Sequence, residues 1–326
     1  MILCKTPLRV SFLGGGTDFP AYFRKHGGAV LGSAVDHNLY HSVMPFHSRL
    51  FDYSIRIAYR EVERVRRVQD IQHAPFREAI QYVGFERDIE VSLTSDLPSF
   101  SGLGSSSSFI VGLLNALYAF KGMSIPKLDL AYKAIDIEQN ILKESVGCQD
   151  QVFAAVGGFN LIEFTESDDI VVHRIPMSRE RLKSLEKRLL FYYTGISRRA
   201  SNLESKKMEN LSGISKHLTQ MRKLVDDGYR AITDGENFDQ LGILLDRAWT
   251  LKKQLAQGVT CETIDDMYTA AKEAGALGGK LLGAGGGGFL LFYVPEDKQP
   301  QVRQALSDFY EIDISLNAPG SQIVHA

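Results

Sequence analysis

The stretch Leu97-Pro-Ser-Phe-Ser-Gly-Leu-Gly-Ser-Ser-Ser-Ser108 leads directly into an apolar segment over residues 109–120. Apolar side chains recur in that segment at helical spacing, which predicts a helix that begins where the glycine- and serine-rich loop ends. The first N–H groups of a helix lack intrahelical partners and carry partial positive charge. The backbone from Gly102 to Ser107 is therefore predicted to bind phosphate oxygens.

The same loop has a simpler interpretation. Serine is a favoured residue at helix starts, so the hydroxyls of residues 105–108 would equally cap a helix that binds no ligand. Hydroxyl oxygens also suit magnesium, which prefers hard oxygen ligands. No lysine precedes the serines, so the loop is not the lysine-containing phosphate loop of many nucleotide-binding proteins. From this stretch alone, both interpretations stay open.

Length and charge narrow the range of functions. The chain has 326 residues, of which 44% are hydrophobic. This length is large for one hydrophobic core and favours two domains, which we place at 1–188 and 189–326. The formal charge of -2 speaks against a nucleic-acid groove or an anionic membrane surface, because both usually show an excess of basic residues. We therefore expect small-molecule ligands, with neither nucleic acid nor membrane as a partner.

The cysteines and the N-terminal segment indicate a cellular compartment. Cys4, Cys148 and Cys261 lie far apart, are odd in number and lack the spacing of a metal site, so we interpret them as free thiols in a reducing environment. The first residues lack a long apolar stretch, and nowhere do about 18 uncharged apolar residues run together. We therefore expect a cytoplasmic protein.

The chain alternates strand and helix signals along its length, which predicts an α+β fold. In the first part, strands are expected at 2–13, 29–35, 38–46, 51–59, 88–94, 159–164 and 170–175, and helices at 19–26, 75–83, 109–120, 127–143 and 150–156. A charged segment, 61–70, is expected to be a solvated edge or loop. A further helix is expected at 178–188, at the end of the first domain. In the second domain, we expect mostly helix over 198–257, helices at 263–274 and 297–309, and strands at 189–193, 279–282, 289–294 and 310–316.

Two further glycine-rich stretches accompany the loop, in a fixed order. The first is Thr6-Pro-Leu-Arg-Val-Ser-Phe-Leu-Gly-Gly-Gly-Thr-Asp18, and the third is Lys280-Leu-Leu-Gly-Ala-Gly-Gly-Gly-Gly288. Together the three motifs resemble those of the small-molecule kinases that include galactokinase, homoserine kinase, mevalonate kinase and phosphomevalonate kinase. The resemblance implies an N-terminal domain like ribosomal protein S5 domain 2 and a ferredoxin-like C-terminal domain with extra helices. It also implies that ATP lies in the cleft between them.

The resemblance assigns roles to particular residues. ATP phosphates would lie on Pro98, Ser101, Gly102, Leu103, Gly104, Ser105, Ser106, Ser107 and Ser108. Mg²⁺ would be held by Ser106 and Glu138. Asp150 would be the catalytic carboxylate facing the acceptor hydroxyl, and Arg9 would lie near the transferred phosphate, as phosphoryl transfer requires. From residue type alone, Asp150 would equally be a helix cap, Glu138 a solvated carboxylate and Arg9 a surface cation.

The first motif departs from galactokinase in the part that contacts the sugar. Galactokinase has Gly-Glu-His-Thr-Asp where this chain has Gly-Gly-Gly-Thr-Asp over 14–18, so two side chains are missing and the pocket is altered. Asp18 remains, although it would equally cap the following helix. The residues expected to bind the substrate are Gly15, Gly16, Thr17, Asp18, Gly285, Gly286, Arg198 and Arg199.

The residues around the first motif indicate a sugar phosphate as substrate. The stretches 13–20, 35–40 and 193–198 are most similar to those of the branch of this family that acts on D-glycero-D-manno-heptose 7-phosphate. That resemblance implies phosphorylation of the anomeric hydroxyl to the 1,7-bisphosphate, on the route to nucleotide-activated heptose for surface polysaccharide. Two alternatives stay open: a kinase of an unphosphorylated sugar such as fucose or galactose, and a non-catalytic sugar sensor.

Overall fold

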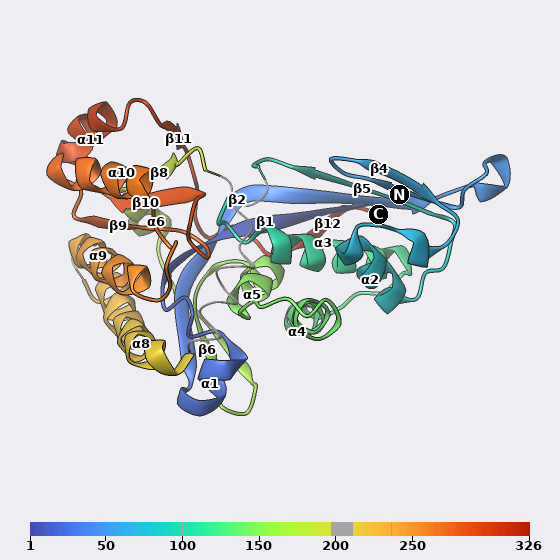
Figure 1. Ribbon diagram of the computed structural model, residues 1–326, viewed down its shortest axis with the longest axis horizontal. Coiled ribbons are helices and arrows are strands. Elements are labelled where there is room, and N and C mark those ends of the chain that lie inside the picture. Colours follow the sequence, from blue (N-terminus) through green and yellow to red (C-terminus); the bar gives the residue numbers. More distant parts are fainter. Residues whose placement is uncertain (99–100, 197–210, 236) are drawn as a thin grey trace.

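The computed structural model describes residues 1–98, 101–196, 211–235 and 237–326. Over these residues the chain forms an eight-stranded sheet and a four-stranded sheet, each covered by helices. Figure 1 shows the larger sheet extending along the long axis of the molecule, with the smaller sheet and its helices at one end. The predicted α+β class is confirmed.

The eight-stranded sheet is organised around two long strands, β1 (Ile2–Leu13) and β2 (Gly28–Pro45), which pair antiparallel. Because β2 is 18 residues long, it pairs with β6 over 28–33 and with β5 over 39–45. The main strand order is β12-β1-β2-β5-β3-β4, and β7 pairs with β6. The remaining strands are β3 (Ile55–Ala58), β4 (Val62–Val65), β5 (Ile89–Ser95), β6 (Phe159–Phe164), β7 (Ile170–Arg174) and β12 (Gln322–His325).

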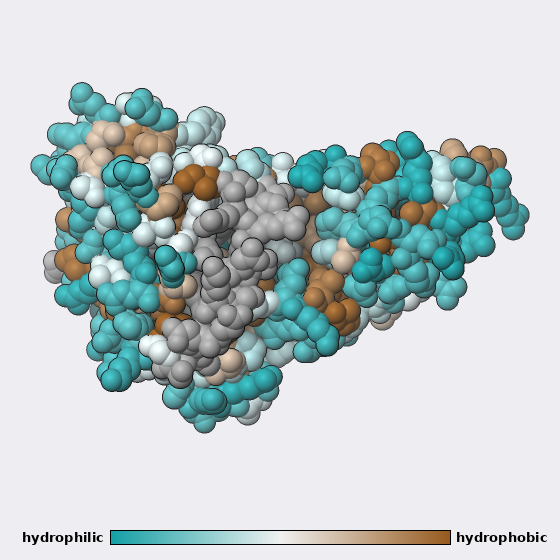
Figure 2. All heavy atoms as spheres, in the orientation of Figure 1, coloured by the Kyte–Doolittle hydropathy of each residue, from teal (hydrophilic) through white to brown (hydrophobic). Residues whose placement is uncertain are grey.

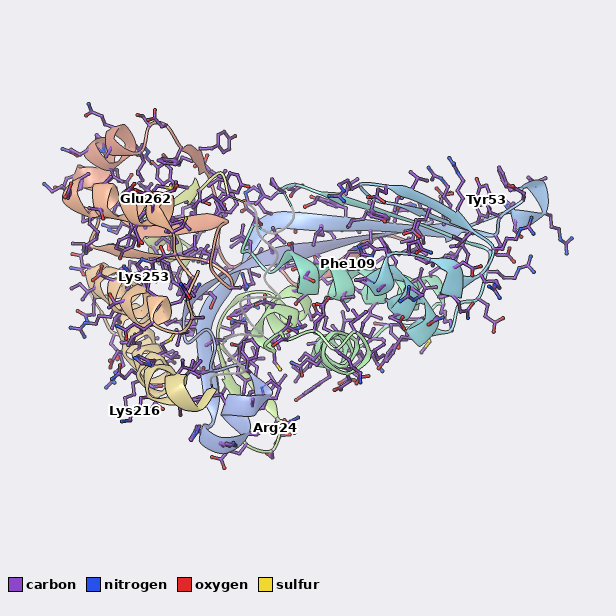
Figure 3. The ribbon with its side chains drawn as sticks, viewed as in Figure 1. Arg24, Tyr53, Phe109, Lys216, Lys253 and Glu262 are labelled. Carbon is purple, nitrogen blue, oxygen red and sulfur yellow. The ribbon has the colours of Figure 1, made fainter. Side chains whose placement is uncertain are left out.

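One face of this sheet is covered by helices (Figure 1). They are α2 (Ala74–Val83), α3 (Ser105–Phe120), α4 (Lys127–Asp136) and α5 (Gln149–Val156). The central helix, α3, is the one predicted directly after the loop, and it packs closely against β1. A Cβ on Gly112 would lie 2.6 Å from the Thr6 hydroxyl, so only glycine permits this approach. Phe109, labelled in Figure 3, meets Phe76 of α2 edge to face, with ring centroids 4.7 Å apart.

The four-stranded sheet is antiparallel and has the order β11-β8-β10-β9. Its strands are β8 (Leu189–Tyr193), β9 (Gly278–Leu281), β10 (Phe289–Tyr293) and β11 (Tyr310–Ile312). This is the strand order of a ferredoxin-like sheet. The helices at this end are α8 (Leu211–Thr233), α9 (Asp239–Lys253), α10 (Glu262–Glu273) and α11 (Gln299–Ala305), and Trp249 of α9 is buried in the core.

Shorter elements complete the fold. They are α1 (Pro20–His26), α6 (Arg179–Glu186), the 3-10 turns η1 (Ser48–Leu50), η2 (Val68–Asp70) and η4 (Glu296–Lys298), and the π-helical segment η3 (Ile137–Ile141). Figure 3 places Tyr53, just beyond η1, at the opposite end of the molecule from Lys253 and Glu262. Figure 2 shows the surface of this narrow end as largely hydrophilic. The charged segment 61–70 lies here and contains the edge strand β4, which agrees with the expected solvated edge.

Several predicted boundaries were wrong. The strands expected at 29–35 and 38–46 are one strand, β2, because pairing with β1 continues through the irregular register between them. The strand expected at 51–59 covers only 55–58, and the one expected at 310–316 covers only 310–312. The helix expected at 127–143 ends at Asp136 and continues as η3. Strand β12 was not predicted, because its four residues carry little pattern of their own.

Two predicted helix caps are also absent. The residue before α3 is Gly104, with a φ of +78°, and no serine side chain caps that helix. The residue before α1 is Phe19, so Asp18 is not its cap. The Asp18 carboxylate instead accepts hydrogen bonds from the N–H groups of Gly16 and Gln149. The local sequence pattern placed these polar side chains at helix ends as caps. In the structure, Asp18 makes tertiary hydrogen bonds instead.

The predicted domains, 1–188 and 189–326, stay a prediction. The four-stranded sheet begins with β8, whereas β12 near the C-terminus pairs with β1 of the larger sheet. Figure 1 accordingly shows the two termini close together. All three cysteines are free thiols, as expected. Within the part of the chain that the structure describes, no helix is both long and apolar enough to cross a membrane.

Candidate active site

The three glycine-rich motifs line one cavity where the two sheets meet. Each motif contributes backbone or side chains to its wall, and the rest comes from α5, α8 and α9 and from Phe19, Val146, Gly147 and Leu255. The lining from the motifs consists of Arg9, Ser11, Gly15, Gly16, Asp18, Gly102, Gly104, Ser105, Ser106, Ser107, Lys280, Gly283, Ala284, Gly285 and Gly287. The other lining residues include Gln149, Asp150, Met221, Lys252 and Leu255. Residues far apart in the sequence thus form a single concave site.

The second and third motifs touch through their backbones. A Cβ on Gly283 would lie 2.6 Å from the Cα of Gly102, and both glycines have positive φ, at +68° and +82°. The N–H of Phe289 donates to the carbonyl of Ser101 across the same contact, at 3.1 Å. Only glycine allows this approach and this conformation together. The glycines therefore hold the glycine- and serine-rich loop of the second motif, the predicted phosphate loop, against the smaller sheet.

Arg9 and Asp150 form a forked ion pair at the cavity wall. The Nε of Arg9 donates to Oδ1 of Asp150 at 2.7 Å, and Nη2 donates to Oδ2 at 2.6 Å. The third nitrogen, Nη1, donates to the carbonyl of Gly102 at 2.7 Å. The side chains are 5% and 23% exposed, respectively. One guanidinium thus fixes the direction of the Asp150 carboxylate and ties it to the phosphate loop.

Glu138 lies in the π-helical segment η3 and is completely buried. Its carboxylate accepts hydrogen bonds from the Ser107 hydroxyl, at 3.1 Å, and from the Gln151 side-chain amide, at 2.5 Å. Burial raises the pKa of Glu138 to about 8. Single π-helical turns are frequent at functional sites. The serine in contact with this carboxylate is Ser107, whereas Ser106 is exposed and lines the cavity.

Asp18 is a buried carboxylate at the edge of the same cavity. Gly16 N–H donates to its Oδ1 at 2.9 Å, and Gln149 N–H donates to its Oδ2 at 3.2 Å. A Cβ on Gly147 would lie 2.0 Å from Oδ2, so the backbone of that loop packs directly on the carboxylate. Burial and, after it, the nearby charge of Asp150 raise the pKa of Asp18 to about 6. Asp18 therefore links the first motif to the start of α5.

Two buried lysines in the lining were not predicted. Lys280 Nζ donates to the carbonyls of Ser11 and Phe12 in β1, each at 2.9 Å, and so joins the two sheets. Lys252 Nζ donates to the carbonyls of Leu281 and Gly283 at the start of the third motif. Lys252 lies on the face of its helix that carries apolar residues. A lysine on such a face is the sequence signal from which its burial could have been predicted. Its role depends on contacts with residues distant in sequence.

The remaining predicted residues fall into two groups. Pro98, Ser101, Leu103, Ser108, Thr17 and Gly286 are described but do not line the cavity. The hydroxyl of Thr17 donates to backbone carbonyls of Gly14 and Ala29, and that of Ser108 donates to the carbonyl of Pro7. These contacts hold the loops in shape. Arg198 and Arg199 lie outside the described residues.

The residues at the loop fit a magnesium ion that is held jointly by the protein and by phosphate oxygens of a bound nucleotide. Within the described residues, no cluster of three or more His, Cys, Asp or Glu side chains is suited to hold a metal ion. Magnesium, however, is usually held by one or two carboxylates together with substrate phosphates. Ser106 and Ser107 line the cavity with hydroxyl oxygens, and the Glu138 carboxylate, which does not itself line the cavity, accepts a hydrogen bond from Ser107. This donor set matches a cation carried by a nucleotide.

Comparison with known proteins identifies the family. The sequence matches the GHMP kinase N-terminal domain over residues 71–158 and the GHMP kinase C-terminal domain over residues 229–312. It is 29% identical to a D-glycero-alpha-D-manno-heptose 7-phosphate kinase of Campylobacter jejuni, over 98% of this chain and 97% of that protein. It is 31% identical to a mevalonate kinase of Thermococcus sibiricus, over 71% of this chain and 68% of that protein.

Solved structures share the whole fold. A D-glycero-D-manno-heptose 1-phosphate kinase from B. thetaiotaomicron superposes with a TM-score of 0.80 at 23% identity, over 100% of both chains. A putative sugar kinase from Campylobacter jejuni superposes with a TM-score of 0.71 at 26% identity, over 98% of this chain and 97% of that one. With both domain models and these full-length relatives in agreement, the chain belongs to the GHMP kinase family.

Proposed function

We propose that this ATP-dependent kinase phosphorylates the anomeric hydroxyl of D-glycero-D-manno-heptose 7-phosphate, giving the 1,7-bisphosphate from which nucleotide-activated heptose is made. The observation that carries the proposal is the forked Arg9–Asp150 pair beside the phosphate loop. A relative named as a D-glycero-alpha-D-manno-heptose 7-phosphate kinase aligns over 98% of the chain. We place the reaction in the cytoplasm, with ATP and the sugar phosphate as the partners.

In the proposed reaction, Asp150 faces the acceptor hydroxyl. The sugar oxygen attacks the γ-phosphorus of ATP, the bond from that phosphorus to the bridging oxygen breaks, and ADP leaves. Asp150 accepts the hydroxyl proton, since each of its oxygens keeps a lone pair beyond the one that Arg9 occupies. Arg9 holds the carboxylate in one orientation throughout.

The phosphate loop and the start of α3 would bind the nucleotide. The N–H groups from Gly104 to Ser107 lie at the positive end of α3, where phosphate oxygens are stabilised. Mg²⁺ would be held by Ser106 and Glu138, with Ser107 beside them, and when bound it would neutralise charge on the phosphates. The protein residues then serve to orient the loop and to keep Glu138 in place.

The remote phosphate of the sugar would need a cation. Arg198 and Arg199 remain our candidates on sequence grounds, and Gly15 and Gly16 give room for a larger sugar. Charge-assisted arginine–phosphate contacts are strong and often forked, which suits this role. The names of two relatives, a heptose 7-phosphate kinase and a heptose 1-phosphate kinase, differ in the position of the substrate phosphate. That position therefore has to be measured.

A kinase of an unphosphorylated sugar is the second candidate. It is favoured by 28% identity to an L-fucokinase/L-fucose-1-P guanylyltransferase of Bacteroides fragilis, over 92% of this chain and 35% of that protein. A non-catalytic sugar sensor is the third, and the complete set of Arg9, Asp150, Ser106 and Glu138 speaks against it.

A substrate panel tests the proposal. ADP release is measured with heptose 7-phosphate, heptose 1-phosphate, unphosphorylated heptose, fucose, galactose and mannose, with Asp150→Asn as the inactive control. We expect the highest kcat/KM for heptose 7-phosphate, and a loss in Arg198→Ala or Arg199→Ala of about 10- to 150-fold that is confined to phosphorylated sugars. Equal rates on heptose and heptose 7-phosphate would contradict the sugar-phosphate assignment.

A further inference from the structure

Two buried polar groups in the cavity lack a hydrogen-bond partner within the described residues. They are the hydroxyl of Ser11, in β1, and the side-chain oxygen Oε1 of Gln149, at the start of α5. Both residues line the cavity, and they are only 6% and 8% exposed. A buried polar group without a partner is unfavourable, so such groups are rare unless something completes their hydrogen bonds.

Both side chains lie beside Gly15. A Cβ on Gly15 would lie 3.6 Å from the Ser11 hydroxyl oxygen and 3.6 Å from Nε2 of Gln149. Because position 15 is glycine, the space between the hydroxyl and the amide is not filled by a side chain of the first motif. The residue that departs from galactokinase thus opens a polar niche between Ser11 and Gln149.

Both groups are held by backbone contacts. The carbonyl of Ser11 accepts a hydrogen bond from Lys280 at 2.9 Å, and the N–H of Gln149 donates to the Asp18 carboxylate at 3.2 Å. The hydroxyl and the amide therefore project from anchored backbone. A site with polar groups held in place before the ligand arrives gains specificity, because less ordering is needed on binding.

Lack of a partner alone does not mark a binding group, as a third buried side chain, His41, shows. Both ring nitrogens of His41 also lack partners within the described residues, but His41 packs against Phe109 and does not line the cavity. Burial lowers the pKa of His41 to about 3, so the ring is neutral in this apolar setting. Ser11 and Gln149 differ because both residues line the cavity.

The chemistry of the niche fits a hydroxyl group. A hydroxyl both donates and accepts hydrogen bonds, and the serine hydroxyl and the glutamine amide each offer both functions. Gln149 directly precedes Asp150, the residue proposed to face the acceptor hydroxyl. We propose that Ser11 and Gln149 bind the sugar hydroxyl on the carbon next to the phosphorylated one, and that they determine specificity for sugars that carry it.

This inference rests on the proposed function, because Asp150 defines the acceptor position. If the anomeric hydroxyl is phosphorylated, the neighbouring group is the hydroxyl on carbon 2. A site built to bind a hydroxyl discriminates strongly against the analogue that lacks it, since its own polar groups then stay unpaired. The enzyme should accordingly discriminate more strongly against the 2-deoxy sugar than against a sugar that lacks a hydroxyl group at another carbon.

The test compares two substrates in wild type and variants. Heptose 7-phosphate and its 2-deoxy analogue are assayed with wild type, Gln149→Met and Ser11→Ala. We expect each variant to lose about 5- to 150-fold in kcat/KM on the natural sugar, because the sugar hydroxyl loses a partner in a buried site. On the 2-deoxy analogue, the same variants should differ from wild type by less than about 3-fold, since the interaction is already absent.

Controls separate recognition from folding. Gln301→Met, on the exposed surface of α11, makes the same chemical change away from the cavity and should leave both substrates unaffected. Melting temperature and ATP affinity are measured for every variant, and Ser11→Ala provides the smaller perturbation if Gln149→Met folds poorly. Equal losses on both sugars, or no loss on either, would overturn the inference.

Failure of the proposed function would be visible separately, in the wild-type enzyme. If wild type does not phosphorylate heptose 7-phosphate, that substrate is wrong, and the comparison is repeated with the best sugar of the panel and its analogue without the neighbouring hydroxyl. A variant loss confined to the hydroxylated sugar would still support the roles of Ser11 and Gln149. A loss independent of that hydroxyl would contradict them.

Discussion

Arg9→Lys is the most informative single substitution at this site, because it retains the positive charge and removes the fork. Arg9 makes three short contacts, two with the Asp150 carboxylate at 2.7 and 2.6 Å and one with the Gly102 carbonyl at 2.7 Å. A lysine ammonium is a compact charge that cannot reproduce the planar fork. We therefore expect at least one charge-assisted contact with Asp150 to be lost.

The expected effect follows from the strength of such contacts. A hydrogen bond to a charged group is worth about 1.5–3 kcal/mol, which corresponds to about 10- to 150-fold in kcat if the carboxylate must keep its orientation in the transition state. Arg9→Met should lose more, because it removes the charge as well. Combining Arg9→Met with Asp150→Asn should cost little beyond the larger single loss, since residues that act as a unit are not additive.

The assay is ADP release at saturating ATP and sugar phosphate, with melting temperature measured in parallel. Arg24→Lys is the matched control, because Arg24 pairs with Asp168 at the same 2.7 Å but the side chains are 57% and 53% exposed. Exposed pairs contribute little, so this variant should retain wild-type kcat and stability. An Arg9→Lys enzyme with wild-type kcat, or additive losses in the double variant, would refute the idea that Arg9 acts by orienting Asp150.

Three further predictions follow from the same geometry. Ser106→Ala and Glu138→Gln should each weaken the response of activity to magnesium, with non-additive effects in the double variant, and fully additive effects would rule out a shared ion. Asp18 has a pKa raised to about 6, so its stabilising contribution is complete below about pH 4 and is lost as the pH rises through 6. Between those limits, wild type should lose about 3 kcal/mol of unfolding free energy relative to Asp18→Asn, measured by urea titration, and a pH-independent difference would contradict this. Gly283→Ala should lower the melting temperature and kcat more than Gly122→Ala, because both glycines have positive φ but only Gly283 meets a neighbouring backbone, at 2.6 Å. Equal effects of the two substitutions would mean that the contact between the motifs is unimportant.

The sequence predicted the elements whose pattern is local. Helix α3 begins directly after the glycine- and serine-rich loop, and strands β6 and β8 have the predicted bounds. These segments carry strong periodicity and clear glycine or proline boundaries, so little depends on distant contacts. The placement of Arg9, Asp18 and Asp150 on one cavity was implied by the resemblance to known kinases rather than by periodicity.

The parts that sequence reasoning missed depend on distant contacts. Strand β12 exists because β1 offers an edge to pair with, and Lys280 matters because it reaches the carbonyls of β1. Thr17 was expected to contact substrate, yet its hydroxyl donates to the carbonyls of Gly14 and Ala29. The role of Gln149 becomes visible only when its side-chain amide is found beside Gly15, with the oxygen of that amide unpaired. No spacing in the sequence reveals a missing hydrogen-bond partner.

The most direct test of the account is phosphorus NMR of the reaction product. Wild-type enzyme is incubated with ATP, magnesium and D-glycero-D-manno-heptose 7-phosphate, and Asp150→Asn is run beside it. The account predicts equal amounts of ADP and of a new sugar phosphate whose phosphorus couples to the anomeric proton, with neither formed by the variant at a comparable rate. ADP without a new sugar phosphate, a phosphate on another carbon, or unchanged turnover in Asp150→Asn would contradict it.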